Sequence, residues 1–318
     1  MIKIGSVEIP SNVILAPMAG CTDLSFRLIA REHGAKFCFF EMVDCNSITY
    51  GQKRRVRSIL RTNKDDLPIA AQLLGRDPDR MLEGAKEMIA MARISFLDIN
   101  AACPAKKVIK KRAGAYLLKD EAELCKIVRR LSAGLNIPVT VKIRTGFDKQ
   151  DLKTLAGLAR KCEGNGAQAI FIHGRTRIQG YAGEIDYASI RAVKESVQIP
   201  VIGSGNIFSP DLARTMTGET GCDGILVARG ALGNPWIFNA IEKVAVPAGL
   251  AFKSRKEVLV RHLGYIERFN ESSPSGKLGY MRKVTLWYTK GFRLAKRIRD
   301  KVSLVNSYDK MLELIESL

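Results

Sequence analysis

Eight short apolar segments recur between residues 13 and 228, each followed by a polar turn and a stretch long enough for a helix. The segments are residues 13–16, 37–42, 69–74, 96–100, 139–143, 169–173, 200–203 and 224–228. Continuous apolar strands that alternate with helices are typical of a parallel sheet covered on both faces. Eight such units favour an α/β fold of the (β/α)8 TIM-barrel type over an open, doubly wound sheet. The open sheet is further disfavoured because no G-x-G-x-x-G turn follows the first segment.

The pattern changes near residue 240, after which no strand candidate appears. Apolar residues now recur at helical spacing, as in Tyr308, Met311, Leu312 and Ile315. The sequence therefore predicts a catalytic barrel domain over residues 1–240 and a small C-terminal helical bundle domain over residues 241–318. A chain of 318 residues is long enough for both.

The chain is strongly basic, with 51 Lys and Arg against 32 Asp and Glu and a net charge of +19. Such a balance indicates a polyanionic partner. The basic residues gather in residues 53–61, 106–112 and 277–301, and the last run interleaves them with Tyr280, Trp287 and Tyr288. Because a solvated helix face normally mixes both signs of charge, these runs predict a nucleic-acid surface with salt-dependent affinity.

The seven cysteines form no C-x-x-C pair, and the chain has only three histidines. We therefore expect reduced thiols and no metal site. The N-terminus lacks the apolar stretch of a signal peptide, and no apolar run reaches membrane-spanning length. These features predict a cytoplasmic protein without membrane contact, and we expect a monomer.

One cysteine differs from the other six, which we interpret as buried small hydrophobic residues. The apolar segment 96–100 ends in Asn100, and Cys103 and Pro104 follow at the start of a basic loop. This places an amide and a thiol just beyond a buried strand. Thiols ordinarily keep their proton at neutral pH, so Cys103 is a candidate proton donor. Nearby lysines favour a thiolate, so this role requires them to face phosphates instead.

Other candidate residues follow the predicted strands, because barrel active sites lie at the carboxyl ends of the strands. The last two loops of such barrels bind phosphate, and here they contain Gly205-Asn206 and Ala228-Arg229-Gly230. Lys142 would neutralise charge on a reduced cofactor ring, although no carboxylate partner for it is apparent nearby in sequence. Gln72 would hydrogen-bond ring edges, and we interpret His173 as a ligand contact.

Eight motifs in order resemble the tRNA-dihydrouridine synthase family, most closely its bacterial B-type branch, from about residue 4 to residue 303. Three lie in the first strands and turns: Ala-Pro-Met-Ala-Gly at 16–20, Thr-Asp-Leu-Ser-Phe-Arg at 22–27 and Gln-Leu-Leu-Gly at 72–75. Asn-Ala-Ala-Cys-Pro-Ala-Lys-Lys-Val follows at 100–108, then Val-Lys-Ile-Arg-Thr-Gly at 141–146 and His-Gly-Arg-Thr-Arg at 173–177. Gly-Asn-Ile at 205–207 and Pro-Trp-Ile-Phe at 235–238 complete the set.

The resemblance implies an enzyme that reduces the C5–C6 double bond of uridines in the tRNA D-loop. It implies FMN on the barrel, NADPH or NADH as reductant, hydride from N5 of FMN to C6, and a proton from Cys103 to C5. The residues that would hold FMN are Ala16, Pro17, Met18, Gln72, Lys142, His173, Ser204, Gly205, Asn206, Ala228 and Arg229. The residues that would contact substrate are Asn100 and Arg144 for the uracil, and Lys106, Lys107, Arg175 and Arg177 for the RNA.

Two positions depart from the family pattern, which usually has glycine where Ala102 and Ala228 stand. If Ala102 required a positive φ, its methyl group would cost about 1 kcal/mol and would displace the thiol. Two alternatives remain open. One is an FMN-dependent oxidoreductase of a free pyrimidine, similar to a dihydroorotate dehydrogenase, and the other is an RNA-binding flavoprotein with a chaperone role.

Overall fold

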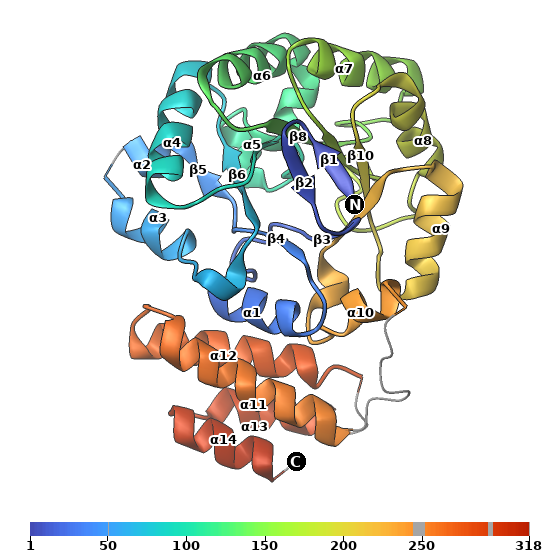
Figure 1. The fold of residues 1–318 in the computed structure, drawn as a ribbon. Coiled ribbons are helices and arrows are strands. Elements are labelled where there is room, and N and C mark those ends of the chain that lie inside the picture. Colours follow the sequence, from blue (N-terminus) through green and yellow to red (C-terminus); the bar gives the residue numbers. More distant parts are fainter. Residues whose placement is uncertain (50, 244–251, 292–294, 318) are drawn as a thin grey trace.

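The computed structural model describes residues 1–49, 51–243, 252–291 and 295–317 and confirms the predicted barrel. All eight predicted strands are present and parallel, and they form one closed sheet (Figure 1). They are β3 (Val13–Leu15), β4 (Phe37–Phe39), β6 (Ile69–Leu74), β7 (Leu97–Asn100), β8 (Val139–Arg144), β9 (Ile170–His173), β10 (Val201–Ser204) and β11 (Gly224–Val227). Closure comes from the pairing of β11 with β3 and of β4 with β6.

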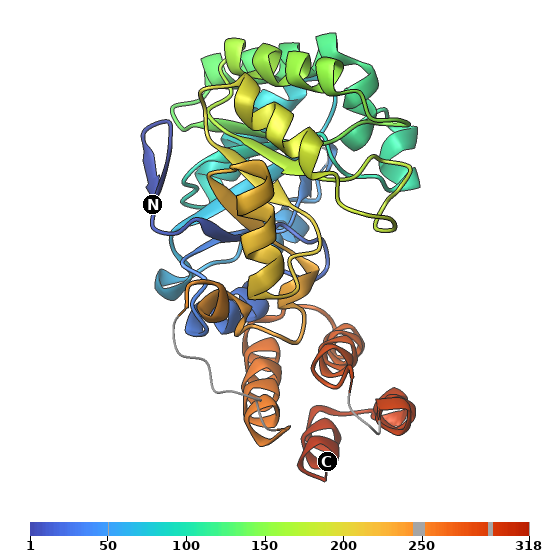
Figure 2. The same ribbon diagram turned by 90° about the vertical axis from the view of Figure 1, so that its right-hand side faces the viewer.

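Three further strands escaped the sequence analysis. A short antiparallel hairpin, β1 (Ile2–Ile4) and β2 (Val7–Ile9), covers the amino-terminal end of the barrel, opposite the long loops at the other end (Figure 2). A two-residue strand, β5 (Val43–Asp44), extends the edge of β6. All three are shorter than the runs from which a strand is recognised by its apolar pattern.

Aromatic rings fill the amino-terminal half of the barrel interior, at the end that the hairpin covers. Phe37 and Phe96 stack with ring centroids 5.4 Å apart, and Phe39 and Phe171 pack against Phe96 at 5.4 and 6.0 Å. Ile2, Ile4 and Ile9 of the hairpin pack against this cluster at the amino-terminal end of the barrel. The amino-terminal half of the barrel is therefore an apolar plug, which leaves the upper half for polar side chains.

Helices surround the barrel, and α1, α4, α6, α7, α8 and α9 begin at side-chain caps. They are α1 (Leu24–Glu32), α2 (Cys45–Thr49), α3 (Lys53–Ile59), α4 (Pro78–Met91), α5 (Lys106–Lys110), α6 (Glu121–Gly134), α7 (Leu152–Gly164), α8 (Tyr187–Ser196), α9 (Pro210–Thr220) and α10 (Ile237–Ile241), with 3-10 turns η1 (Lys64–Asp66), η2 (Gly114–Lys119) and η3 (Arg229–Ala231). Ser209 accepts a hydrogen bond from the backbone N–H of Leu212, and Pro210 occupies the first turn of α9, where both residue types are favoured.

The C-terminal part is helical, as predicted. It consists of α11 (Phe252–Phe269), α12 (Pro274–Tyr288), α13 (Ala295–Leu304) and α14 (Tyr308–Glu316). These helices share their own apolar core and pack against Ile29 of α1 and against Trp236, as the position of the bundle beside α1 and α10 in Figure 1 shows. The predicted boundary at residue 240 falls inside α10 and stays a prediction.

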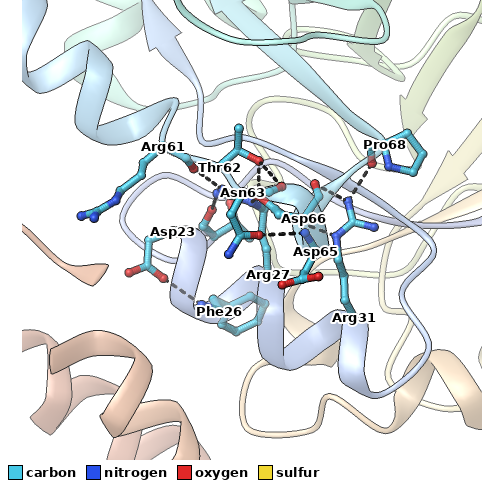
Figure 3. Close-up of polar contacts among 11 residues, drawn as sticks. Asp23, Phe26, Arg27, Arg31, Arg61, Thr62, Asn63, Asp65, Asp66 and Pro68 are labelled. Atoms are coloured by element: carbon cyan, nitrogen blue, oxygen red, sulfur yellow. Dashed lines mark hydrogen bonds and ion pairs between the residues drawn. The ribbon is translucent and has the colours of Figure 1, made fainter. Parts of the chain in front are cut away.

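A buried ion-pair network lies in the barrel wall on the side that faces the bundle (Figure 3). Arg27 of α1 donates from Nε and Nη2 to Oδ2 of Asp66 at 2.9 and 2.7 Å, and both side chains are 0% exposed. Arg31 donates to Oδ1 of the same carboxylate at 3.1 Å, and Thr62 adds a third donor. Arg61, whose carbonyl accepts from Arg27, donates in turn to the carbonyl of Phe269 at the end of α11. The network therefore connects α1, η1 and the bundle.

We expect Asp66→Ala to lower the free energy of unfolding by roughly 3–5 kcal/mol, because it leaves the buried charge of Arg27 without a partner. Chemical denaturation of the purified protein measures this. The control is Asp79→Ala, which removes an exposed pair with Arg130 and should cost less than about 1 kcal/mol. Equal losses in the two variants would contradict a structural role for the network.

Candidate active site

A single cleft opens where the barrel strands end at their carboxyl side. It encloses about 370 Å³, within the range of roughly 300–1,000 Å³ usual for small-molecule sites. All eleven residues predicted to hold a cofactor line it, together with Cys103, Asn100 and Arg144. The eight strand ends thus bring together side chains as far apart in sequence as Ala16 and Arg229.

The ends of β10 and β11 form a cradle that only small residues permit. Gly205 has a φ of +138°, and Asn206 follows at +52°, a left-handed conformation that asparagine tolerates better than most residues. A Cβ at Gly230 would lie 1.8 Å from the carbonyl oxygen of Ile207, so the two loops touch at this glycine. Arg229 lies beside them, with its guanidinium 3.5 Å from Oδ1 of Asn206. Backbone approach and a cation together suit an anion such as a phosphate.

The two alanines that replace the family's usual glycines cause no backbone strain of the kind considered above. Ala102 is not among the residues with positive φ, and Ala228 has a φ of −115°. The concern that the methyl group of Ala102 displaces the thiol through a strained backbone is therefore wrong.

Lys142 on β8 points into the cleft and has an acidic neighbour that the sequence analysis missed. Asp98 of β7 is 0% exposed, and burial raises its carboxyl pKa to about 6, although hydrogen bonds from Gln72 and Thr140 oppose the shift. Burial, with help from Arg144, lowers the pKa of Lys142 to about 8, while Asp98 acts in the opposite direction. The signal lay in the alternation of β7, which directs Asp98 and Asn100 to the same side of the strand.

His173 stands among cations at the end of β9. Burial is the main reason that its pKa lies well below the usual range, and Lys142, Arg144, Arg175 and Arg229 add to the effect. The imidazole is therefore neutral at physiological pH and offers one donor and one acceptor to a ligand.

Hydrogen bonds fix the loop that carries Cys103. Oδ1 of Asn100 accepts from the backbone N–H groups of Ala102 and Cys103 at 3.1 and 2.9 Å. Nε of Arg144 donates to the carbonyl of Ala102 at 2.7 Å, and its Nη1 donates to the carbonyls of Thr176 and Gly180. Both residues line the cleft as predicted, but much of their hydrogen-bonding capacity positions loops.

The residues predicted to contact RNA fall into two groups. Lys106 and Lys107 are exposed on α5, just beyond the cleft wall, and Arg177 is half-buried against the ring of Phe147. Arg175 is only 1% exposed, and its Nε and Nη2 donate to the carbonyl of Gly183. The prediction that Arg175 contacts RNA is therefore not supported by its position, because the neighbouring loop covers it.

Several lining residues were not predicted. Tyr181 is 59% exposed, and Arg229 lies 4.5 Å from its ring centroid. Cys21 lines the cleft and Cys125 is half-buried, so the interpretation of both as buried hydrophobic residues is wrong. Burial raises the pKa of the Cys21 thiol, although Lys283 of the bundle, 3.5 Å from Sγ, opposes the shift.

The predicted contribution of Tyr288 to a nucleic-acid surface is wrong, whereas Tyr280 and Trp287 are half-buried and their contribution stays a prediction. Tyr288 is buried and lies 3.2 Å from Nδ1 of His262, and Trp287 packs edge-on against Phe26. The basic residues of α13 are exposed, namely Lys296, Arg297, Arg299 and Lys301, and their contact with nucleic acid stays a prediction.

Two searches of the described residues complete the inventory. No group of three or more His, Cys, Asp or Glu side chains there lies in an arrangement that suits a metal ion. No helix in that part of the chain combines the length and apolar composition that crossing a bilayer requires.

Comparison with known proteins agrees with this arrangement. A family model described as dihydrouridine synthase matches residues 14–317, so the chain belongs to the dihydrouridine synthase family. The tRNA-dihydrouridine synthase B of Pseudomonas aeruginosa is 35% identical, over 97% of this chain and 93% of the relative. That of Vibrio cholerae is 34% identical, over 99% and 97%. The resemblance drawn from the motifs is thereby confirmed.

Solved structures show the same fold at low identity. A crystal structure of TcOYE superimposes with a TM-score of 0.58 at 13% identity, covering 80% of this chain and 95% of that one. Morphinone reductase gives 0.54 at 13% identity, covering 80% and 91%. At this identity the likeness concerns the barrel architecture alone.

Proposed function

We propose that this protein reduces the C5–C6 double bond of uridines in the D-loop of tRNA. The observation that carries the proposal is the position of Cys103, a half-buried thiol that shares one cleft with Lys142 and with the glycine cradle of β10 and β11. A proton donor, a cation and an anion cradle are the elements that reduction of a nucleobase by a phosphate-bearing cofactor requires.

The cleft fits FMN. A larger residue at Gly205 or Gly230 would collide with Ile185 or with the carbonyl of Ile207, so only glycine lets these turns pack closely, and Arg229 supplies a charge beside them. Lys142, Gln72 and His173 line the floor, where they would contact the ring system, and Ala16, Pro17 and Met18 form a small apolar wall. A reduced FMN bound here would supply hydride to C6 of the uracil. NADPH or NADH would supply the electrons.

The protein's own contribution is to bind the base and to deliver a proton. We assign proton donation to C5 to the thiol of Cys103, which the Asn100 turn holds at the mouth of the cleft. Met42, Arg144 and Tyr181 line the remaining walls and would exclude water from the base. The target uridine must leave its stack to enter, as other bases do when enzymes act on them.

We infer that an RNA strand meets exposed basic residues on α3, α5 and α13. Lys53, Arg54, Arg55 and Arg57 are exposed on α3, and Lys106 and Lys107 on α5. The exposed basic residues of α13 extend the positive surface onto the bundle. These groups would neutralise several phosphates, so tRNA affinity should fall steeply with salt. A free pyrimidine requires none of them, which favours RNA as the substrate over the dihydroorotate-type alternative.

The remaining assignments follow from a tRNA substrate and stay part of the proposal. They are a cytoplasmic location, a monomeric state, and separate roles for a barrel domain over residues 1–240 and a bundle domain over residues 241–318.

Deletion of the gene should remove dihydrouridine from specific D-loop positions in tRNA. Mass spectrometry of nucleosides and of mapped tRNA fragments from the deletion strain measures this, and purified protein should restore the modification in that tRNA. Unchanged dihydrouridine at every position, in a strain with no second enzyme of the family, would contradict the proposal.

Replacement of the proton donor should separate binding from chemistry. We expect Cys103→Ala to bind tRNA with near-normal affinity and to turn over roughly 10²–10⁴-fold more slowly, the usual contribution of a general acid. Cys125→Ala is the matched control, because this half-buried cysteine lies on α6 outside the cleft, and its turnover should match the wild type. Wild-type turnover in Cys103→Ala would remove this thiol from the mechanism.

Cofactor binding should depend on the contact between the two glycine loops. Gly230→Ala forces the loops apart, so we expect FMN affinity to fall roughly tenfold or more, about 1.4 kcal/mol. Titration of cofactor-stripped protein with FMN, followed by flavin fluorescence, measures the affinity. In the control Gly218→Ala on α9 the added methyl meets no atom within 4 Å, so FMN affinity should not change.

A further inference from the structure

A chain of buried hydrogen bonds runs from the interior of the barrel to the backbone of Cys103. It begins at Asp98, whose carboxylate lies beneath the floor of the cleft. Oδ1 accepts from the hydroxyl of Thr140 at 2.7 Å, and Oδ2 accepts from Nε2 of Gln72 at 2.7 Å. Oε1 of Gln72 accepts from Nδ2 of Asn100 at 2.7 Å, and Oδ1 of Asn100 accepts from the N–H of Cys103 at 2.9 Å.

The direction of every bond in this chain follows from its first member. An ionised carboxylate only accepts hydrogen bonds, so Gln72 must turn its NH2 group toward Asp98. The side-chain carbonyl of Gln72 then faces Asn100, whose NH2 group must donate to it. The carbonyl of Asn100 is thereby left facing the backbone N–H groups of the Cys103 turn, which require an acceptor. A reversed amide anywhere along the chain would place two donors or two acceptors together, at the cost of an unsatisfied buried group.

The turn has other supports, but they contact different atoms. Arg144 donates to the carbonyl of Ala102, and the carbonyl of Cys103 accepts from the N–H of Ala115 at 3.1 Å. Asn100 satisfies the N–H groups of Ala102 and Cys103, which those two contacts leave untouched. The orientation of the Asn100 side-chain amide therefore determines whether the backbone N–H groups of Ala102 and Cys103 have an acceptor.

We propose that Asp98 is a positioning residue that fixes the Cys103 turn through Gln72 and Asn100, before any ligand binds. Its importance for the reaction rests on the proposed role of Cys103 as proton donor. Asp98 also opposes the lowering of the Lys142 pKa, so the experiment must separate the hydrogen-bond direction from the charge.

Two substitutions at Asp98 make that separation. Asp98→Leu removes the acceptor and leaves the amide of Gln72 without an anchor. Asp98→Asn removes the charge but keeps the direction, because its carbonyl can face Gln72 while its NH2 group donates to Thr140, whose hydroxyl rotates to accept. If direction matters, only the leucine variant should loosen the turn.

Amide hydrogen exchange of Ala102 and Cys103, in the protein as purified and without tRNA, measures the turn directly. We expect exchange roughly fivefold faster in Asp98→Leu, the effect of losing about one ordinary hydrogen bond, and within about twofold of wild type in Asp98→Asn. Amides in β7 and β8 serve as reference and should not change. Equal acceleration in both variants, or none in Asp98→Leu, would overturn the proposal.

Gln72→Leu cuts the same chain at its middle and leaves Asp98 paired with Thr140, so it tests the idea if Asp98→Leu fails to fold. It should accelerate exchange of the same two amides as much as Asp98→Leu does, and wild-type exchange would overturn the inference. Failure of the proposed function would look different. In that case Cys103→Ala would turn over normally, while exchange of the Cys103 turn would still respond to Asp98→Leu.

Discussion

A carboxylate inside a barrel has to be satisfied by donors that the barrel itself provides, and in this protein that requirement organises the floor of the cleft. Asp98 is fully buried, and its oxygens are occupied by Thr140 and Gln72. Because each buried polar group needs a partner, the orientation of Gln72 at Asp98 determines the orientation of Asn100. Asn100 in turn accepts a hydrogen bond from the backbone N–H of Cys103. The same carboxylate lies close enough to Lys142 to oppose the loss of its charge.

The apolar core and the cleft occupy opposite ends of the barrel axis. The amino-terminal half is packed with phenylalanine rings and covered by the hairpin, and these apolar side chains require no hydrogen-bond partners. The upper half is polar and opens into the cleft, where glycine turns and cations replace the apolar packing. Such a division explains how one barrel can hold a rigid core and a ligand site a few residues apart on the same strands.

The bundle is connected to the barrel on two sides of α1. The buried pair of Arg27 and Asp66 holds α1 against η1, and Arg61 carries the connection to α11. Nearer the cleft, Lys283 and Tyr280 of α12 donate to the carbonyls of Gly20 and Cys21 in the loop after β3. The bundle, which carries the exposed basic residues of α13, is thus held to the barrel by contacts of α11 and α12.

The eight-stranded barrel, the helical C-terminus and most of the cleft lining could be predicted from the sequence, because apolar periodicity and residues at strand ends are local properties. It did not reveal the partner of Lys142, the covered position of Arg175 or the inward packing of Tyr288, because burial and pairing depend on residues far apart in the chain. The loop contacts of Asn100 and Arg144 likewise became apparent only in the folded protein. The hydrogen-bond partners of these side chains depend on the register of neighbouring strands in the closed barrel. That register cannot be read from any single segment of the sequence.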